Sequence, residues 1–162
     1  MSGRIVSINL SKGGVPKLPV DAAEVRSLGI VGDVQRNQRY HGGPDRALCL
    51  YSMEVIEALR AEGHPIAPGT TGENVTIAGL DWSRLVPGVR LALGAIEAVV
   101  TGYAAPCRNI QPFFIDRDSS RIDQRRHRGW SRIYCRVITP GALRVGDPVS
   151  INPPRSIVCT PA

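Results

Sequence analysis

Apolar residues recur at every second position in many short stretches of this chain. In residues 89–93 and 132–138, apolar side chains alternate with polar or small ones. A period of two is typical of a strand that buries one face. The same reading predicts nine strands, at residues 4–10, 21–25, 47–51, 74–77, 89–93, 96–101, 132–138, 142–145 and 148–152.

One segment has helical rather than strand spacing. Apolar residues in 52–62 recur at intervals of three, Ser52 can act as the N-cap, and Gly63 and Pro65 follow the segment. These features predict a helix that begins after Ser52 and ends before Gly63. A second, shorter helix is expected within residues 109–115.

Glycine and proline separate the predicted strands, with 17 and 13 copies in 162 residues. Residues 93–96 and 139–141 predict tight hairpins, and residues 145–148 predict a turn. About nine short strands with one or two short helices favour a closed or nearly closed β-barrel, which leaves few sheet edges exposed. We expect one domain over residues 1–152 and a proline-rich tail over 153–162.

Composition agrees with a globular domain, since 43% of residues are hydrophobic and 21% are charged. No apolar stretch approaches the roughly 18 residues of a membrane span. The first residues contain no apolar core of a secretion signal, so we expect a cytoplasmic protein whose thiols stay reduced.

The positive charge is concentrated in the last third of the chain. Residues 1–103 hold ten basic and ten acidic side chains, whereas residues 104–162 hold ten arginines and four aspartates. The net charge of +6 therefore lies in the second segment. Arginine binds oxyanions in a bidentate manner, so this segment indicates an anionic partner such as a phosphate, a phosphorylated cofactor or nucleic acid.

Two glycine-containing motifs are candidate binding loops. His41, Gly42 and Gly43 lie in YHGGPDRA, where two glycines allow close approach to a ligand; the alternative is a rigid surface loop. PGTTGEN ends in Gly72, Glu73 and Asn74. It can form an anion-binding nest, or be an ordinary loop whose Glu or Asn caps backbone groups.

Cys107 is the candidate reactive thiol. It follows Pro106 just after a predicted strand, and the neighbouring cation Arg108 favours the thiolate form that attacks or binds a metal. The alternative is a small buried side chain. Cys49 and Cys135 lie within predicted strands and are expected in the core, and Cys159 lies in the tail.

Six arginines between residues 117 and 132 form a basic segment that reads as a mobile loop. It can be a solvated face, a phosphate clamp or a nucleic-acid patch. Only Trp130 and Tyr134 lie close to it for base stacking, and no known nucleic-acid motif is present, which disfavours nucleic acid.

Together these motifs resemble a known family. GIVGD, HGGPDRALCLYS, PGTTGENVTIAGL, a Pro-Cys after a strand and RIYCRVITPGALRVGDPV occur in the order found in the molybdenum cofactor sulfurase C-terminal (MOSC) domain. The resemblance runs from about residue 3 to residue 151. It implies a β-barrel that binds a molybdenum–pterin cofactor.

The resemblance also implies roles for individual residues. Cys107 is the expected catalytic residue, as molybdenum ligand or as sulfur-carrying group. The expected cofactor-binding residues are His41, Gly42, Gly43, Ser52, Gly72, Glu73, Asn74 and Arg108. Ser52 is expected to bind the cofactor phosphate, because it lies at the start of a helix and helix N-termini bind phosphate groups.

Three functions follow from the resemblance and the charge. The first is an oxidoreductase that reduces small N-hydroxylated or other N–O compounds, with electrons from a separate protein. The second is a sulfur carrier that takes persulfide sulfur from a cysteine desulfurase, in which case pyridoxal phosphate enters only through that partner. The third is a non-catalytic domain whose basic loop binds RNA or an acidic partner.

Overall fold

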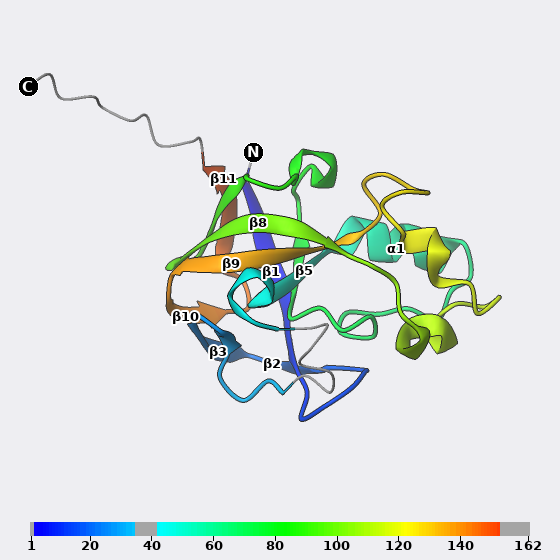
Figure 1. Cartoon of the computed structure of the whole chain (residues 1–162), viewed down its shortest axis with the longest axis horizontal. Coiled ribbons are helices and arrows are strands. Elements are labelled where there is room, and N and C mark those ends of the chain that lie inside the picture. Colours follow the sequence, from blue (N-terminus) through cyan, green and yellow to red (C-terminus); the bar gives the residue numbers. More distant parts are fainter. Residues whose placement is uncertain (1, 35–41, 153–162) are drawn as a thin grey trace, which may run out of the picture.

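The computed structural model describes residues 2–34 and 42–152 and is built mainly from strands (Figure 1). The strands are β1 Ser2–Leu10, β2 Leu18–Val20, β3 Ala22–Arg26, β4 Gly29–Ile30, β5 Leu48–Ser52, β6 Val75–Ala78, β7 Arg90–Leu93, β8 Ile96–Ala104, β9 Arg132–Thr139, β10 Gly141–Arg144 and β11 Pro148–Asn152. All nine predicted strands are present, and the sequence reading missed only the very short β2 and β4.

Seven strands close into a barrel. The main sheet has the order β11-β7-β8-β9-β5-β6-β1-β2, and β11 also pairs with β1, which completes the ring. Ser2 pairs with Ser150 and Arg4 with Pro148 at this closing seam. The pairing between β5 and β6 is parallel, with α1 in the connection between them. The predicted β-barrel is therefore confirmed.

A small second sheet holds β3, β4 and β10. Residues 93–96 form the predicted hairpin, because Leu93 pairs with Ile96. The predicted hairpin at 139–141 is wrong: β10 pairs with β3, not with β9. The turn at Pro140 carries the chain from the barrel to the second sheet, and a turn motif alone does not say which strand the next segment will join.

The helix α1 spans Met53–Ala61, as predicted, with Ser52 as its N-cap. Ile56 and Leu59 are its buried side chains, and they pack into the main core. Four 3₁₀ turns complete the structure: η1 Pro44–Arg46, η2 Trp82–Arg84, η3 Arg108–Phe113 and η4 Ser119–Ile122. The predicted second helix is thus η3, a 3₁₀ turn that contains Pro112, whose missing N–H disfavours a regular α-helix.

The period-two pattern of β9 separates its two faces. Ile133, Cys135 and Val137 belong to the main core. Tyr134 belongs to a separate small cluster, and Arg136 is exposed, so these residues lie on the outer face. Figure 1 shows α1 and the 3₁₀ turns after β8 on one side of the barrel, and β3 and β10 on another.

Within residues 2–34 and 42–152, no helix is both long and apolar enough to cross a membrane.

Candidate functional site

Cys107 lies in the connection between the end of β8 and η3, and it is half-buried. Cys49 and Cys135 are buried, so Cys107 is the most accessible thiol in the described part of the chain. Burial raises the pKa of Cys49 to about 11, and it also raises the pKa of Cys135. Both buried thiols therefore stay protonated near neutral pH, which makes them poor nucleophiles and metal ligands.

Arg132 joins the PGTTGEN loop to the end of β8, the strand that precedes Cys107. Its side chain is only 4% exposed, and its Nη1 donates to the carbonyl oxygen of Thr71. Its Nη2 donates to the carbonyl oxygen of Ala105 at 3.1 Å and, more weakly, to that of Ala104 at 3.5 Å. The end of β8 and the PGTTGEN loop, more than 30 residues apart in sequence, are thereby held together by one buried cation.

The Nε atom of Arg132 is buried and has no hydrogen-bond partner among the described residues. No acidic side chain in the described ranges forms a salt bridge with this guanidinium. A buried cation with a spare donor is costly unless an anion or acceptor satisfies it. The buried carboxylate of Glu73 partly compensates this charge: burial raises the pKa of Glu73, and the Arg132 guanidinium partly opposes that rise.

Cys49 connects the PGTTGEN loop to the outer face of the barrel. Its N–H donates to Oδ1 of Asn74 at 3.0 Å, and its carbonyl accepts from the N–H of Asn74 at 2.7 Å. The Cys49 side chain packs with Ala104 and Tyr134 in the small outer cluster. The expectation that Cys49 is buried is confirmed, but it lies under the candidate site instead of inside the barrel.

Tyr134 lies beside both Cys49 and Cys107. Burial is the main cause that raises the pKa of Tyr134 to about 12, and the two thiols raise it further. The guanidinium of Arg46 lies over the Tyr134 ring, 5.4 Å from its centroid. Such a contact favours a cation near the ring face.

Asn74 also contacts a buried ion pair. Its Nδ2 donates to Oδ2 of Asp33 at 2.9 Å, and the same oxygen accepts from Nζ of Lys17. The Asp33 and Lys17 side chains are almost fully buried. The GIVGD motif therefore reaches the PGTTGEN loop through the Asp33 carboxylate.

Glu73 is fully buried, and its carboxylate forms hydrogen bonds within its own loop and to β6. Its carboxylate accepts from the N–H of Gly69 at 2.7 Å and from the hydroxyls of Thr71 at 2.8 Å and Thr76 at 3.1 Å. Burial is the main cause that raises its pKa, and these donors partly oppose it.

Backbone N–H groups of the PGTTGEN loop also have hydrogen-bond partners within the protein. The N–H of Gly72 donates to Gly69, and that of Thr70 donates to Ala67. Of the two interpretations of this loop, the structure favours a loop capped by Glu73 and Asn74 over an anion-binding nest, because its donors already have partners.

The described part of the YHGGPDRA motif covers the outer cluster. Gly42 and Gly43 have positive φ values of 110° and 80°, which glycine adopts without strain. Gly43 precedes η1, whose Asp45 pairs with Arg136 on β9. His41 lies outside the described residues, so its position as a cofactor-binding residue remains a prediction.

Ser52 and Arg108 occupy different environments. Ser52 is 1% exposed; its Oγ accepts from the N–H of Val55 and donates to Glu54. This is an N-cap role, and so little exposed surface leaves no open face for a cofactor phosphate. Arg108 is exposed at the start of η3, next to Cys107.

The arginines of residues 117–132 have separate roles. Arg121 pairs with Glu62 at 2.7 Å and stacks on Trp130 at 3.8 Å, and Arg132 is buried. Arg125 and Arg128 are exposed. The segment is therefore not one uniform basic face, and only part of it is open to a ligand.

A groove of about 530 Å³ opens beside Tyr134. Arg46, Tyr103 and Tyr134 line it, together with Gly102. A Cβ added to Gly102 would meet nothing within 4 Å, so this part of β8 is open. The groove gives a small molecule access to the outer cluster that holds Cys49 and Tyr134.

The described residues contain no group of three or more His, Cys, Asp or Glu side chains that could hold a metal ion. A cofactor that brings most of the ligands for its own metal needs only one protein ligand, such as the Cys107 thiolate.

Sequence reading named Arg132 only as one of six arginines of a basic segment, Tyr134 only as a nearby aromatic residue and Asp33 only within GIVGD, and it gave Lys17 no role. For Arg132, the signal was a charged residue at the start of a strand, on the same face as Tyr134 and Arg136. Burial of that face depends on the loops that cover it, which the pattern does not reveal.

Comparisons with known proteins identify the family to which this sequence and fold are similar. A profile of the MOSC domain matches residues 37–150. The protein YiiM of Escherichia coli strain K12 is 29% identical over 143 residues, which cover 85% of this chain and 62% of that protein. The uncharacterized protein YflK of Bacillus subtilis strain 168 is 28% identical over 117 residues, which cover 71% of this chain and 52% of YflK. The chain thus spans less than two thirds of these two relatives.

Solved structures give the same result. The crystal structure of YiiM from Geobacillus stearothermophilus superposes with a TM-score of 0.74 at 26% identity, over 93% of this chain and 75% of that one.

Proposed function

Because the chain belongs to the MOSC domain family, which is associated with molybdenum cofactor binding, we propose that it binds a molybdenum–pterin cofactor through Cys107. The observation that carries this proposal is the accessible thiol of Cys107 with the exposed cation Arg108 next to it in the chain. A thiolate is a soft anionic ligand suited to such a metal. The cation suits the negative charge of a phosphorylated pterin.

The residues that would hold the cofactor come from three segments. Cys107 would supply sulfur to the metal, and the exposed side chain of Arg108, the next residue, would contact an anionic group. Arg46 lies over the Tyr134 ring of the outer cluster, and Gly42 and Gly43 shortly precede it in the chain. Asn74 and Glu73 would act indirectly, because their polar atoms already hold the Cys49 strand and the PGTTGEN loop.

The cofactor, when bound, would supply oxo-transfer chemistry to an N-hydroxylated or other N–O substrate. The chain itself would bind the substrate in the groove lined by Arg46, Tyr103 and Tyr134. The hydroxyl of Tyr103 would donate a hydrogen bond to a substrate oxygen. Electrons would come from a separate redox protein.

The test is metal analysis of the protein made in a host that builds the cofactor. We expect molybdenum and pterin in the wild type and loss of both, together with N–O reductase activity, in Cys107→Ser. Serine is close in size but stays neutral and hard, so stability should change by less than about 1.5 kcal/mol. Cys135→Ala is the matched control, because this thiol is fully buried in the main core.

A Cys107→Ser protein that keeps its molybdenum would overturn the proposal. A Cys107→Ser protein that fails to fold would mean that the thiol serves packing instead.

The same accessible thiol supports a second function, that of a sulfur carrier. Cys107 would then attack the persulfide of a cysteine desulfurase, take its terminal sulfur and leave the desulfurase thiolate behind. Incubation with a pyridoxal-phosphate-dependent desulfurase and cysteine would add 32 Da to Cys107, read by mass spectrometry. Sulfur transfer in protein without molybdenum would favour this function over the first.

A further inference from the structure

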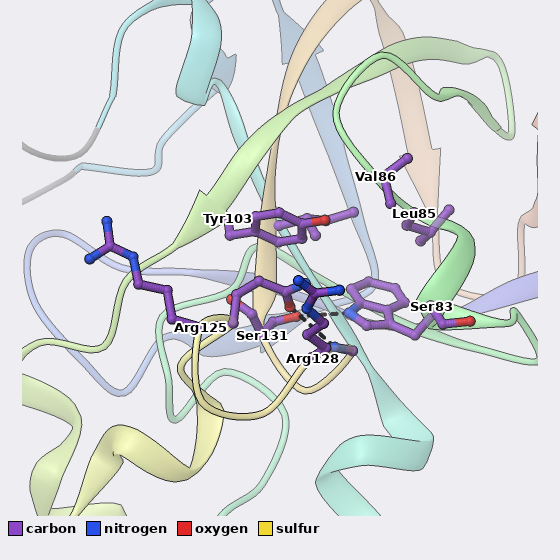
Figure 2. Close-up of a pocket in the computed structure, with 11 residues that line it drawn as sticks. Ser83, Leu85, Val86, Tyr103, Arg125, Arg128 and Ser131 are labelled. Carbon is purple, nitrogen blue, oxygen red and sulfur yellow. Dashed lines mark hydrogen bonds between the residues drawn. The ribbon is translucent and has the colours of Figure 1, made fainter.

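A second, larger pocket is not lined by Cys107. It has a volume of about 740 Å³ and opens where η2, the end of β8 and residues 124–131 meet (Figure 2). This volume falls in the range of small-molecule sites. Cys107, Arg132 and Arg46 do not line it, and Tyr103 is the one residue that it shares with the groove beside Tyr134.

The inner wall of this pocket is apolar and aromatic. Leu85 and Ile133 are each 1% exposed and belong to the main core. Tyr103 is half-buried and lies across the pocket from Arg128 and Ser131 (Figure 2). Trp82 is held in the wall because its Nε1 donates to the carbonyl oxygen of Ser131 at 2.8 Å. A flat ring fits such a wall, since aromatic side chains favour stacked or edge-to-face contacts.

The outer edge of the pocket is cationic. Arg125 and Arg128 line it, and both are exposed. Within residues 2–34 and 42–152, neither guanidinium has an acidic partner, in contrast to Arg121, which pairs with Glu62. None of the residues that line the pocket is acidic. Two arginines without counter-ions beside an aromatic wall favour an oxyanion on an aromatic ring.

The loop that carries these arginines is fixed at its base. The N–H of Gly129 donates to Oε1 of Gln124 at 3.1 Å, and the N–H of Arg125 donates to Oδ1 of Asp123 at 2.8 Å. The backbone of the loop is therefore set while the two guanidinium groups stay open to a ligand. This reduces the entropy that a ligand must offset when it orders the site.

We propose that this pocket binds a small planar aromatic molecule that carries one oxyanion. The ring lies against Tyr103 and the apolar wall, and the oxyanion contacts Arg125 and Arg128. A carboxylate and a phosphate share this chemistry, and the experiment separates them. The proposal does not depend on the cofactor, because the pocket contains neither Cys107 nor Arg132.

The test is isothermal titration calorimetry of the full chain with four probes: 2-naphthoate, 2-naphthyl phosphate, 2-naphthalenemethanol and cyclohexanecarboxylate. We expect 2-naphthoate or 2-naphthyl phosphate to bind about 10-fold or more tightly than the neutral alcohol, because charge-assisted hydrogen bonds are lost in the alcohol. The tighter of the two anions identifies the oxyanion. Cyclohexanecarboxylate, which keeps the charge but has no flat ring, is expected to bind more weakly than 2-naphthoate.

Two variants and one control assign the binding to this pocket. Arg128→Gln and Arg125→Gln should each weaken the aromatic anion by about 10-fold. Arg144→Gln, an exposed arginine on β10, is the matched control and should bind like the wild type. The proposal would be overturned if Arg125→Gln and Arg128→Gln bound the aromatic anion as tightly as Arg144→Gln and the wild type. It would also be overturned if the neutral alcohol bound the wild type as tightly as the aromatic anions.

Two further measurements separate this proposal from others. Cys107→Ser should bind the aromatic anion unchanged, so the pocket can be confirmed even if the cofactor proposal fails. A single-stranded oligonucleotide that binds through Arg125 and Arg128 while the aromatic anions do not would show a nucleic-acid surface and would also overturn the proposal.

Discussion

Arg132 and Arg136 lie on the same face of β9, yet their surroundings differ. Arg132 is buried and donates to the carbonyl oxygens of Thr71 and Ala105, whereas Arg136 pairs with Asp45 in solvent. Both side chains of the exposed pair are more than half accessible. Truncating a buried charged side chain leaves its buried partners without a hydrogen bond, whereas water replaces an exposed ion pair. Truncation of Arg132 should therefore lower the free energy of unfolding more than truncation of Arg136.

We expect Arg132→Met to lower the free energy of unfolding by about 3 kcal/mol, because buried carbonyl oxygens lose a charged donor. Arg136→Met should lower it by less than about 1 kcal/mol, as for other exposed ion pairs. Urea denaturation of both variants measures the difference. Equal effects would mean that Arg132 is not the tie between the PGTTGEN loop and the end of β8.

Glu73 predicts a pH dependence of stability. Burial raises its pKa in the folded protein above the ordinary value of 4.5, so the folded state holds this proton more tightly than the unfolded chain. The contribution of Glu73 to stability is then fully present below about pH 4.5 and is lost as pH rises through the folded-state pKa.

Glu73→Gln removes this titration. Between pH 4.5 and 8, the unfolding free energy of the wild type should therefore fall relative to that of Glu73→Gln, which denaturation at several pH values would measure. Parallel curves for the two proteins would show that Glu73 ionises equally in both states.

Among the elements, α1 allows two roles of Ser52 to be tested separately: capping the helix and binding the cofactor phosphate. Ser52 caps this helix and is almost fully buried. We expect Ser52→Ala to lower the melting temperature, with a cost of about 1 kcal/mol, the usual effect of losing an N-cap. It should leave the molybdenum content unchanged.

Ser52→Thr is the matched control, since threonine also caps helices. Loss of molybdenum in a stable Ser52→Ala protein would restore the interpretation that Ser52 holds the cofactor phosphate.

The whole barrel depends on its closing strand. β11 pairs with β1 on one side and with β7 on the other, so it completes the ring. A chain that stops after Asp147 lacks β11 and should lose cooperative thermal unfolding, because two strand edges become exposed. A chain that stops after Asn152 should keep it, as expected if the domain spans residues 1–152. Circular dichroism melting curves of both truncations test this boundary.

The strand positions, the capped helix, the buried Cys135 and the accessible Cys107 could all be predicted from the sequence. Each prediction rests on a pattern among residues close together in the chain, such as period two in β9 or a serine before a helical run. Such patterns follow from the local geometry of strands and helices. The order of the motifs also identified the MOSC family, which the profile match over residues 37–150 confirms.

Tertiary structure alone decided which outer surfaces are covered. Period two separates the two faces of β9 but cannot say that the PGTTGEN loop covers Arg132, or that β10 leaves β9 to pair with β3. Those contacts join segments far apart in the chain, and their burial depends on how the barrel closes. The buried cation that ties the PGTTGEN loop to the end of β8, and the aromatic pocket edged by Arg125 and Arg128, therefore form only when the strands are assembled.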